Sequence, residues 1–381
     1  MDYACTSFPK PDEVIRAMTD YMTRIGSNVS RSSYETAYEA EEIVYDTRAS
    51  LCELFHGPDV KNVIFTKNIT ESLNVLLKGL LKPGDHVLVS SMEHNAVMRP
   101  LNQIAREITF TRIPCDRQGH LQIEEMEALL LPSTRAVVMM TASNVSGTLM
   151  PVDEVGAFCR KHGLIFIVDS AQTAGAFSID MEKTGIDALA FTGHKGLLGP
   201  QGIGGFIITD ELAGQLDPLI SGGTGSFSHT ELVPEILPDR FEAGTLNLPG
   251  IAGLGAALKF LKERGIDSIL AHERKMTQLF LDQIASLEES GCLKIAGPRT
   301  AAERSAVISV CPLCMDPSEI AFRLEREYGI LTRVGLHCAP SAHKSLGTYP
   351  GGTVRFSFGW ATREDEIETA ARALGEICGH C

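Results

Sequence analysis

Lys195 and Asp169 follow short apolar segments, and this pair of residue types could carry out carbonyl chemistry. The run 165–169 (IFIVD) is typical of a buried strand whose last carboxylate emerges at the strand's end. Lys195 comes later, in a glycine-containing turn between two further apolar runs. Pyridoxal 5'-phosphate (PLP) needs such a pair, because a lysine amine forms a Schiff base with its aldehyde while a carboxylate keeps its pyridine nitrogen protonated. Thr192 and His194 flank the lysine and are suitable donors to the phosphate.

Two more polar residues follow apolar segments in the same way. His94 comes after the segment 86–90, and Asn144 comes after 136–140. A histidine can stack on an aromatic cofactor ring, and an asparagine can donate to a phenolic oxygen. A histidine bonded to backbone and an Asn-containing turn are the plainer alternatives. Ligands of parallel sheets bind at the carboxyl ends of strands, so we expect all these residues to lie together.

The elements that must position these residues alternate along the chain. Apolar segments at 63–65, 86–90, 137–140, 165–169, 188–191 and 205–208 are interleaved with helical patterns at 70–80, 96–106 and 153–162, after helices at 11–25 and 34–55. This alternation predicts an α/β fold with a mostly parallel, helix-covered sheet.

The pattern changes from about residue 250. Long helical patterns at 250–263 and 266–288 lead to strands near 305–311, 331–334 and 353–358 and to helices over 317–328 and 363–377. These elements predict a smaller α+β domain. We expect a large cofactor-binding domain over 12–255 and a small domain made of 256–381 together with 1–11.

Composition excludes several classes of function. The content of 44% hydrophobic and 22% charged residues is that of a globular protein, and 381 residues suffice for two domains. A net charge of −14 argues against nucleic acid as a partner, and no basic run suggests a membrane surface. The first residues lack a secretion signal pattern, so we expect a cytoplasmic protein with free thiols among its ten cysteines.

Two C-x-x-C pairs are the only metal-like spacing. They are Cys311 with Cys314 and Cys378 with Cys381. A zinc site built from both is an alternative, but Cys311 continues an apolar strand pattern and chain ends often fray. We therefore predict no metal site, and a redox pairing of Cys378 with Cys381 stays open.

Seven segments, in this order, resemble those of the class V aminotransferase fold, and the cysteine desulfurases of the SufS-like type most of all. They are 66–74 (TKNITESLN), 92–94 (MEH), 143–148 (SNVSGT), 168–172 (VDSAQ), 192–195 (TGHK), 240–245 (RFEAGT) and 332–339 (TRVGLHCA). The resemblance implies a PLP-dependent transferase of fold type I. It also implies that the cofactor is held by Thr70, His94, Asn144, Asp169, Gln172, Thr192, His194 and Lys195.

The resemblance implies the remaining roles as well. Gly244 and Thr245 would reach the phosphate from a second subunit, which implies a homodimer. Arg355, a costly residue inside an apolar strand unless it is paired, would clamp the substrate α-carboxylate, with a structural ion pair as the alternative. Arg333 would lie in the site too.

Cys338 separates this activity from ordinary transamination. The resemblance makes it the nucleophile that takes sulfur from L-cysteine, leaving L-alanine and a persulfide, with Lys195 and His94 as the other catalytic residues. His337 and Arg333 are expected to favour its thiolate. The persulfide would pass to an acceptor protein or a reductant. The alternatives are a selenocysteine lyase acting on L-selenocysteine, another class V aminotransferase or lyase, and a non-catalytic scaffold of the same fold.

Overall fold

The computed structural model describes residues 1–29, 34–313 and 315–379. Its larger part is built on a seven-stranded sheet of order β1-β7-β6-β5-β4-β2-β3. The strands are β1 (Val63–Thr66), β2 (His86–Ser90), β3 (Thr109–Ile113), β4 (Thr134–Met140), β5 (Ile165–Asp169), β6 (Ala188–Thr192) and β7 (Gly204–Ile208). The pairs among β3, β2, β4, β5 and β6 are parallel, whereas β7 runs antiparallel to both of its neighbours. The predicted mostly parallel sheet is confirmed.

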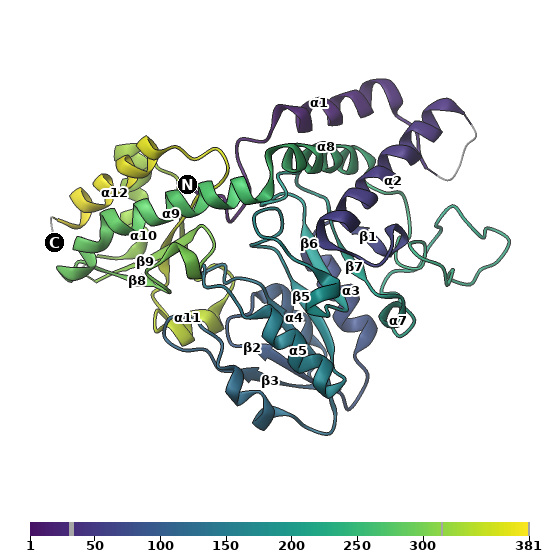
Figure 1. Ribbon diagram of the computed structural model, residues 1–381, viewed down its shortest axis with the longest axis horizontal. Coiled ribbons are helices and arrows are strands. Elements are labelled where there is room, and N and C mark those ends of the chain that lie inside the picture. The colour runs from purple at the N-terminus through teal and green to yellow at the C-terminus, as the bar shows by residue number, and fades with distance from the viewer. Residues whose placement is uncertain (30–33, 314, 380–381) are drawn as a thin grey trace.

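Helices cover both faces of this sheet (Figure 1). They are α1 (Asp12–Asp20) with a π-turn (Tyr21–Ile25), α2 (Glu35–Phe55), α3 (Ile69–Leu80), α4 (Asn95–Gln103), α5 (Val152–His162), α6 (Met181–Thr184), α7 (Asp210–Ala213) and α8 (Leu248–Arg264). Residues alternate along each strand: in β5, Phe166 and Val168 join the core with α2, α5 and α8, whereas Ile167 joins the core with α3 and α4. Two separate apolar layers result, and they hold the strand ends in fixed positions.

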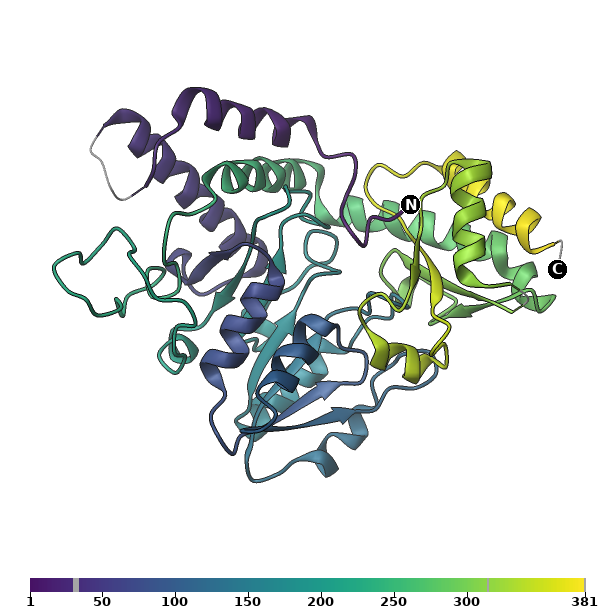
Figure 2. The same cartoon turned by 180° about the vertical axis from the view of Figure 1, so that it is seen from behind.

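A second, antiparallel sheet has the order β10-β11-β9-β8. Its strands are β8 (Leu293–Ala296), β9 (Val307–Pro312), β10 (Arg333–Gly335) and β11 (Thr353–Ser357). The helices around this second sheet are α9 (Ile266–Glu289), α10 (Pro317–Tyr328), α11 (Pro340–Leu346) and α12 (Glu364–Cys378). Elsewhere along the chain, short 3-10 turns lie at Val60–Asn62, Ile123–Glu125 and Glu127–Leu129, and another lies at Ala301–Glu303. Figure 2 shows this smaller part beside the first residues of the chain.

The predicted elements recur with shifts of a few residues, and five strands and α-helices were missed, of which α6 and α7 are only four residues long each. β3 is half-exposed and lies at the sheet edge, β8 is a short edge strand, and α11 is only seven residues long. Each offers too few buried apolar positions to give a periodic pattern.

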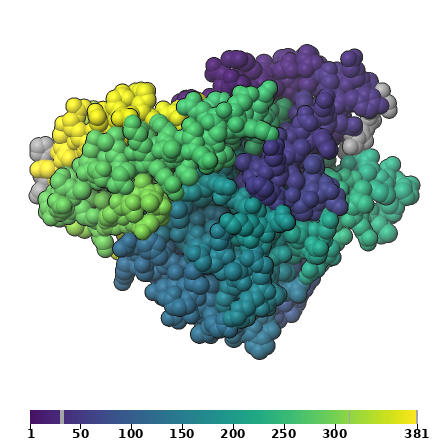
Figure 3. Space-filling model, in the orientation of Figure 1, coloured from purple at the N-terminus to yellow at the C-terminus, as the bar shows by residue number. Residues whose placement is uncertain are grey.

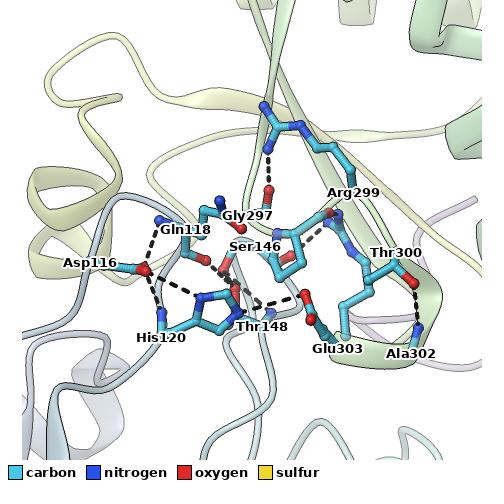
Figure 4. A network of polar contacts seen from close by, with 12 residues as sticks. Asp116, Gln118, His120, Ser146, Thr148, Gly297, Arg299, Thr300, Ala302 and Glu303 are labelled. Atoms are coloured by element: carbon cyan, nitrogen blue, oxygen red, sulfur yellow. Dashed lines mark hydrogen bonds and ion pairs between the residues drawn. The ribbon is translucent and has the colours of Figure 1, made fainter.

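The two sheets are joined through the loop after β4. Arg304 is buried, and its Nη2 donates to the carbonyl oxygens of Ser146, at 2.6 Å, and Val307, at 2.7 Å. Figure 4 shows the neighbouring contacts, where His120 lies between Asp116 and Glu303, at 3.2 and 3.9 Å. The loop that follows the predicted Asn144 is therefore fixed from both sides.

A long loop over 214–247 projects on the side away from the small sheet, as Figures 1 and 3 show. It carries exposed apolar side chains, namely Leu219, Ile220, Phe227, Leu232, Val233 and Ile236. None of the helices in the described part of the chain combines the length and apolar character needed to cross a membrane.

Candidate active site

Lys195 and Asp169 lie at the carboxyl ends of two adjacent parallel strands. Asp169 is the last residue of β5 and is only 4% exposed, and its Oδ1 accepts a hydrogen bond from the amide of Ala171 at 2.9 Å. Burial raises the pKa of this carboxyl, while the Ala171 bond and the Lys195 charge act in the opposite direction. Burial lowers the pKa of Lys195 to about 8, against the effect of Asp169. An amine that is partly neutral at physiological pH can attack an aldehyde.

His94 lies beside these residues at the start of α4. Its Nδ1 accepts a hydrogen bond from the amide of Ala96 at 3.0 Å, so the ring also caps the helix. Burial, followed by the charges of Lys195, Arg333 and Arg355, lowers its pKa to about 4. The histidine is therefore uncharged at neutral pH, as stacking on a protonated pyridine ring requires.

Three buried polar atoms of predicted cofactor residues have no partner among the described residues. They are Thr192 Oγ1, His194 Nδ1 and Asn144 Oδ1. Leaving such atoms unpaired is costly, so they indicate a bound group with several polar atoms. Together with the Lys195 amine and the Asp169 carboxyl, these atoms fit PLP.

The other predicted cofactor residues are less closely joined to this group. Gln172 lines a small cavity with Lys195, and its Nε2 donates to the carbonyl oxygen of Ala4 at 3.4 Å. Thr70 is an exposed residue of the first turn of α3, and the N-cap of this helix is Asn68. Thr70 stays a predicted phosphate contact.

Gly244 and Thr245 lie in the exposed loop 214–247. The amide of Gly244 donates to the carbonyl oxygen of Gly223, a bond within that loop. Among the described residues of this one chain, no recorded contact joins the two residues to the Lys195 group.

Arg355 is 1% exposed in the middle of β11. Its Nη2 pairs with Asp2 at 2.8 Å and its Nη1 donates to the carbonyl oxygen of Asn144 at 3.0 Å, whereas its Nε is buried without a partner in the described chain. The structural ion pair that was the alternative to a substrate clamp is thus present, and the Nε donor of Arg355 has no partner among the described residues. Arg333 lies directly opposite on β10.

Cys338 is exposed on a strained loop, where both His337, at φ 47°, and Cys338, at φ 58°, are left-handed. Two hydrogen bonds hold this conformation. Asn144 Nδ2 donates to the carbonyl oxygen of His337 at 2.7 Å, and the backbone amide of Asn95 donates to the carbonyl oxygen of Cys338 at 2.8 Å. Strain of this kind at a reactive side chain is typical of functional sites.

Of the two residues expected beside the Cys338 thiol, Arg333 brings its positive charge to the sulfur. Its Nη2 lies 3.7 Å from the Cys338 Sγ. His337 is buried against Thr353, and burial, followed by the charge of Arg355, lowers its pKa to about 2. A neutral imidazole brings no positive charge to the thiol, and the His337 Nε2 contacts Thr353 Oγ1 at 3.0 Å.

The sequence did not point to three residues of the site. Asp2, Cys5 and Asn95 contact the site only through the tertiary structure, and no local periodicity marks them. Only their places beside recognised segments, such as Asn95 after His94, could have drawn attention to them.

Within the described ranges, His, Cys, Asp and Glu side chains form no group of three or more that could hold an ion. Cys311 lies in β9 and Cys378 in α12, both as free thiols, whereas Cys314 and Cys381 lie outside the described residues.

Known proteins share this architecture and sequence. The family description "Aminotransferase class-V" matches residues 1–369. A protein named "Probable cysteine desulfurase" from Methanothermobacter thermautotrophicus is 32% identical to this chain, and the match covers 99% of this chain and 94% of that protein. A protein of the same name from Pyrococcus abyssi is 34% identical, and the match covers 99% of this chain and 93% of that protein. A solved apo structure of a cysteine desulfurase from Thermococcus onnurineus is 30% identical, with a TM-score of 0.91 over 100% of this chain and 94% of that one.

These matches cover the whole architecture, including the Cys338 loop and both sheets. They confirm the fold type I prediction, whereas the narrower SufS-like type and the individual site roles stay predictions. The chain belongs to the class V aminotransferase family and, within it, to the cysteine desulfurases.

Proposed function

We propose that this chain is a PLP-dependent desulfurase that takes the sulfur of L-cysteine onto Cys338 and leaves L-alanine. The observation that carries the proposal is the Cys338 loop. It is pinned to Asn95 and Asn144, beside the Lys195 group, with the Arg333 guanidinium at the sulfur. An ordinary aminotransferase has no need of a thiol in this position.

The roles of the residues follow from their environments. When bound, PLP draws electrons away from the substrate Cα. Asp169 would hold the pyridine nitrogen protonated, and His94, uncharged, would bind beside the ring. Thr192, His194 and Thr70 would hold the phosphate, and Asn144 and Gln172 would bind the rest of the cofactor. Lys195 holds the cofactor and then moves the proton at the substrate Cα, for which a pKa of about 8 is suited.

Sulfur transfer is the task of Cys338. Arg355 and Arg333 hold the substrate carboxylate and so orient the substrate sulfur towards the Cys338 thiolate. The thiolate attacks that sulfur, the substrate Cβ–S bond breaks, and a persulfide S–S bond forms on Cys338. The carbon skeleton leaves as alanine. The sulfur then passes to an acceptor protein or to a reductant.

A homodimer completes the site in this proposal. Gly244 and Thr245 are exposed, and in the described part of the chain no recorded hydrogen bond joins them to Thr192 or His194. The loop 214–247 that carries them, and α2 with Tyr38 and Tyr45, expose large apolar side chains. They also share a cleft of 490 Å³ lined by Tyr45 and Gly244. A second copy of the chain would cover this surface and receive Thr245.

The deciding experiment compares Cys338→Ser with the wild type. The variant should keep its cofactor but stop forming alanine and sulfide from L-cysteine, because a hydroxyl is a poor sulfur acceptor. Cys292→Ser, between α9 and β8, is the matched control and should retain activity. Full desulfurase activity in Cys338→Ser would overturn the proposal. Activity kept only with L-selenocysteine would mark selenium chemistry that does not require this thiol.

A further inference from the structure

Two thiols, not one, contact the guanidinium of Arg333. Its Nη2 lies 3.7 Å from the Cys338 Sγ, and its Nη1 lies 4.0 Å from the Cys5 Sγ. The two sulfurs therefore sit at the two terminal nitrogens of one planar cation. A guanidinium stabilises a thiolate, the nucleophilic form of cysteine, so this arrangement suits two reactive thiols.

Cys5 is held at the site from both sides. On one side, Asp2 pairs with Arg355 at 2.8 Å and the amide of Ala4 donates to Ser357 Oγ at 2.9 Å. On the other, the amide of Ser7 donates to the carbonyl oxygen of His194, next to Lys195, at 2.9 Å. Figure 2 shows the segment that contains Cys5 running from beside the small sheet to α1.

Cys5 lies within electrostatic reach of two other residues of the site, Lys195 and Arg355. Arg355 Nε, on a side chain 1% exposed, is unpartnered in the described chain and belongs to the same cluster. Cys5 is half-buried, whereas Cys338 is exposed.

We propose that Cys5 is a second sulfur carrier, which takes the outer sulfur from the Cys338 persulfide within the same subunit. This inference rests on the proposed function of Cys338. The Cys5 thiolate attacks the outer sulfur, the S–S bond to Cys338 breaks, and a new S–S bond forms on Cys5. Cys338 leaves as a thiolate, and the Arg333 guanidinium stabilises the negative charge on its sulfur. The transferred sulfur keeps its oxidation state, so the step needs no outside oxidant.

The geometry favours attack on the outer sulfur over the inner one. Hydrogen bonds from Asn144 and Asn95 pin the backbone carbonyls of His337 and Cys338, so the loop as a whole is held in place and does not shift towards Cys5. The outer sulfur of a persulfide projects one S–S bond, about 2 Å, beyond Sγ. The transfer would empty the exposed thiol for a second turnover and store the first sulfur in a more sheltered position.

The test maps sulfur after the holoenzyme reacts with L-cysteine without added reductant, followed by alkylation and trypsin. The peptides 1–16 and 334–344 each contain a single cysteine, Cys5 and Cys338. In the wild type, both should carry an additional sulfur. In Cys5→Ser, only the 334–344 peptide should carry it, and in Cys338→Ser, neither should. Cys292→Ser should match the wild type.

The burst of alanine gives an independent readout. A rapid-quench burst of about two alanines per site is expected in the wild type, and about one in Cys5→Ser, because the acceptor thiols fill in turn. Labelling of Cys338 in Cys5→Ser also shows that this variant is folded and competent.

The failures of the two proposals are distinguishable. Alanine formation with sulfur on Cys338 but never on Cys5 would overturn the relay and leave the proposed function intact. Sulfur on Cys5 in Cys338→Ser would overturn the order of transfer. A disulfide joining the two peptides would show attack on the inner sulfur and would also overturn the relay. If the wild type formed no alanine and neither peptide carried an additional sulfur, the proposed function itself would be refuted.

Discussion

Arg333 and Arg355 lie directly opposite each other on the antiparallel strands β10 and β11. Like charges in this position destabilise a sheet unless an anion lies between them. Asp2 pairs with Arg355, yet the Arg355 Nε is left over, and Arg333 faces the site. A second carboxylate, that of an amino-acid substrate, would complete the charge balance.

Replacing Arg355 should therefore weaken substrate binding. Hydrogen bonds to charged groups contribute about 1.5–3 kcal/mol. We expect Arg355→Ala to raise the KM for L-cysteine by roughly ten- to a hundredfold. Steady-state alanine formation measures it. Asp2→Asn is the control, since it removes the ion pair but not the clamp. If Asp2→Asn raised KM as much as Arg355→Ala, the role of Arg355 would be structural.

Lys195→Ala should abolish the visible colour of the purified holoenzyme, because the covalent link to the cofactor is lost. Absorbance spectra of variant and wild type at equal concentration provide the measurement. Lys183→Ala, at an exposed lysine of α6, should remain as coloured as the wild type. An unchanged visible band in Lys195→Ala would remove this lysine from the proposed site.

Cofactor uptake should depend on pH through the same amine. Burial lowers the pKa of Lys195 to about 8 from its ordinary 10.5, so the neutral, nucleophilic form becomes the major one above about pH 8. The rate of colour development after PLP is added to the apoprotein should rise with pH and level off above that value. A rate that keeps rising to pH 10 would show an unperturbed lysine.

Glu93 makes stability depend on pH. It is 1% exposed, and burial raises its pKa to about 8 from 4.5, against the hydrogen bonds from Ser90 and Met140. Above the ordinary pKa of a glutamate, the Glu93 carboxyl loses its proton in the unfolded chain but keeps it in the folded chain. The free energy of unfolding therefore falls as pH rises towards 8. The loss is up to about 1.4 kcal/mol per pH unit.

Glu93→Gln, which cannot titrate, should therefore gain stability over the wild type as pH rises from 5 to about 8. Melting temperatures measured across this range would show the growing difference. Glu124→Gln, a change in the short turn Ile123–Glu125, serves as the matched control and should leave the pH profile of the wild type unchanged. A constant gap between Glu93→Gln and the wild type would contradict the raised pKa.

The exposed apolar side chains of the loop 214–247 should be covered in a dimer. Leu232, 79% exposed, and Ile236, 50% exposed, are suited to a test. We expect the wild type to sediment as a dimer, and the double variant Leu232→Asp, Ile236→Asp to sediment as a monomer with reduced PLP affinity. Leu331→Asp, also at an exposed position, should leave the dimer intact. A wild-type monomer that binds PLP and turns over would refute the shared site.

Much of the site was predictable because strand ends gather at one edge of a parallel sheet. His94, Asn144, Asp169 and Lys195 each follow a strong apolar pattern, and the structure places each one at such an end. What the sequence could not show were relations between distant segments. The Asp2 partner of Arg355 is 353 positions away, and the neutrality of His337 depends on burial against Thr353.

The pinned first segment also bears on how the protein is made. Asp2 to Ser7 are synthesised well before their partners on the Lys195 turn and on β11. Contacts so far apart in sequence form late, since the intervening chain must be ordered first. The reactive lysine and both thiols are therefore assembled into one site only after β11 has been synthesised, so a nascent chain that lacks β11 carries no working catalyst.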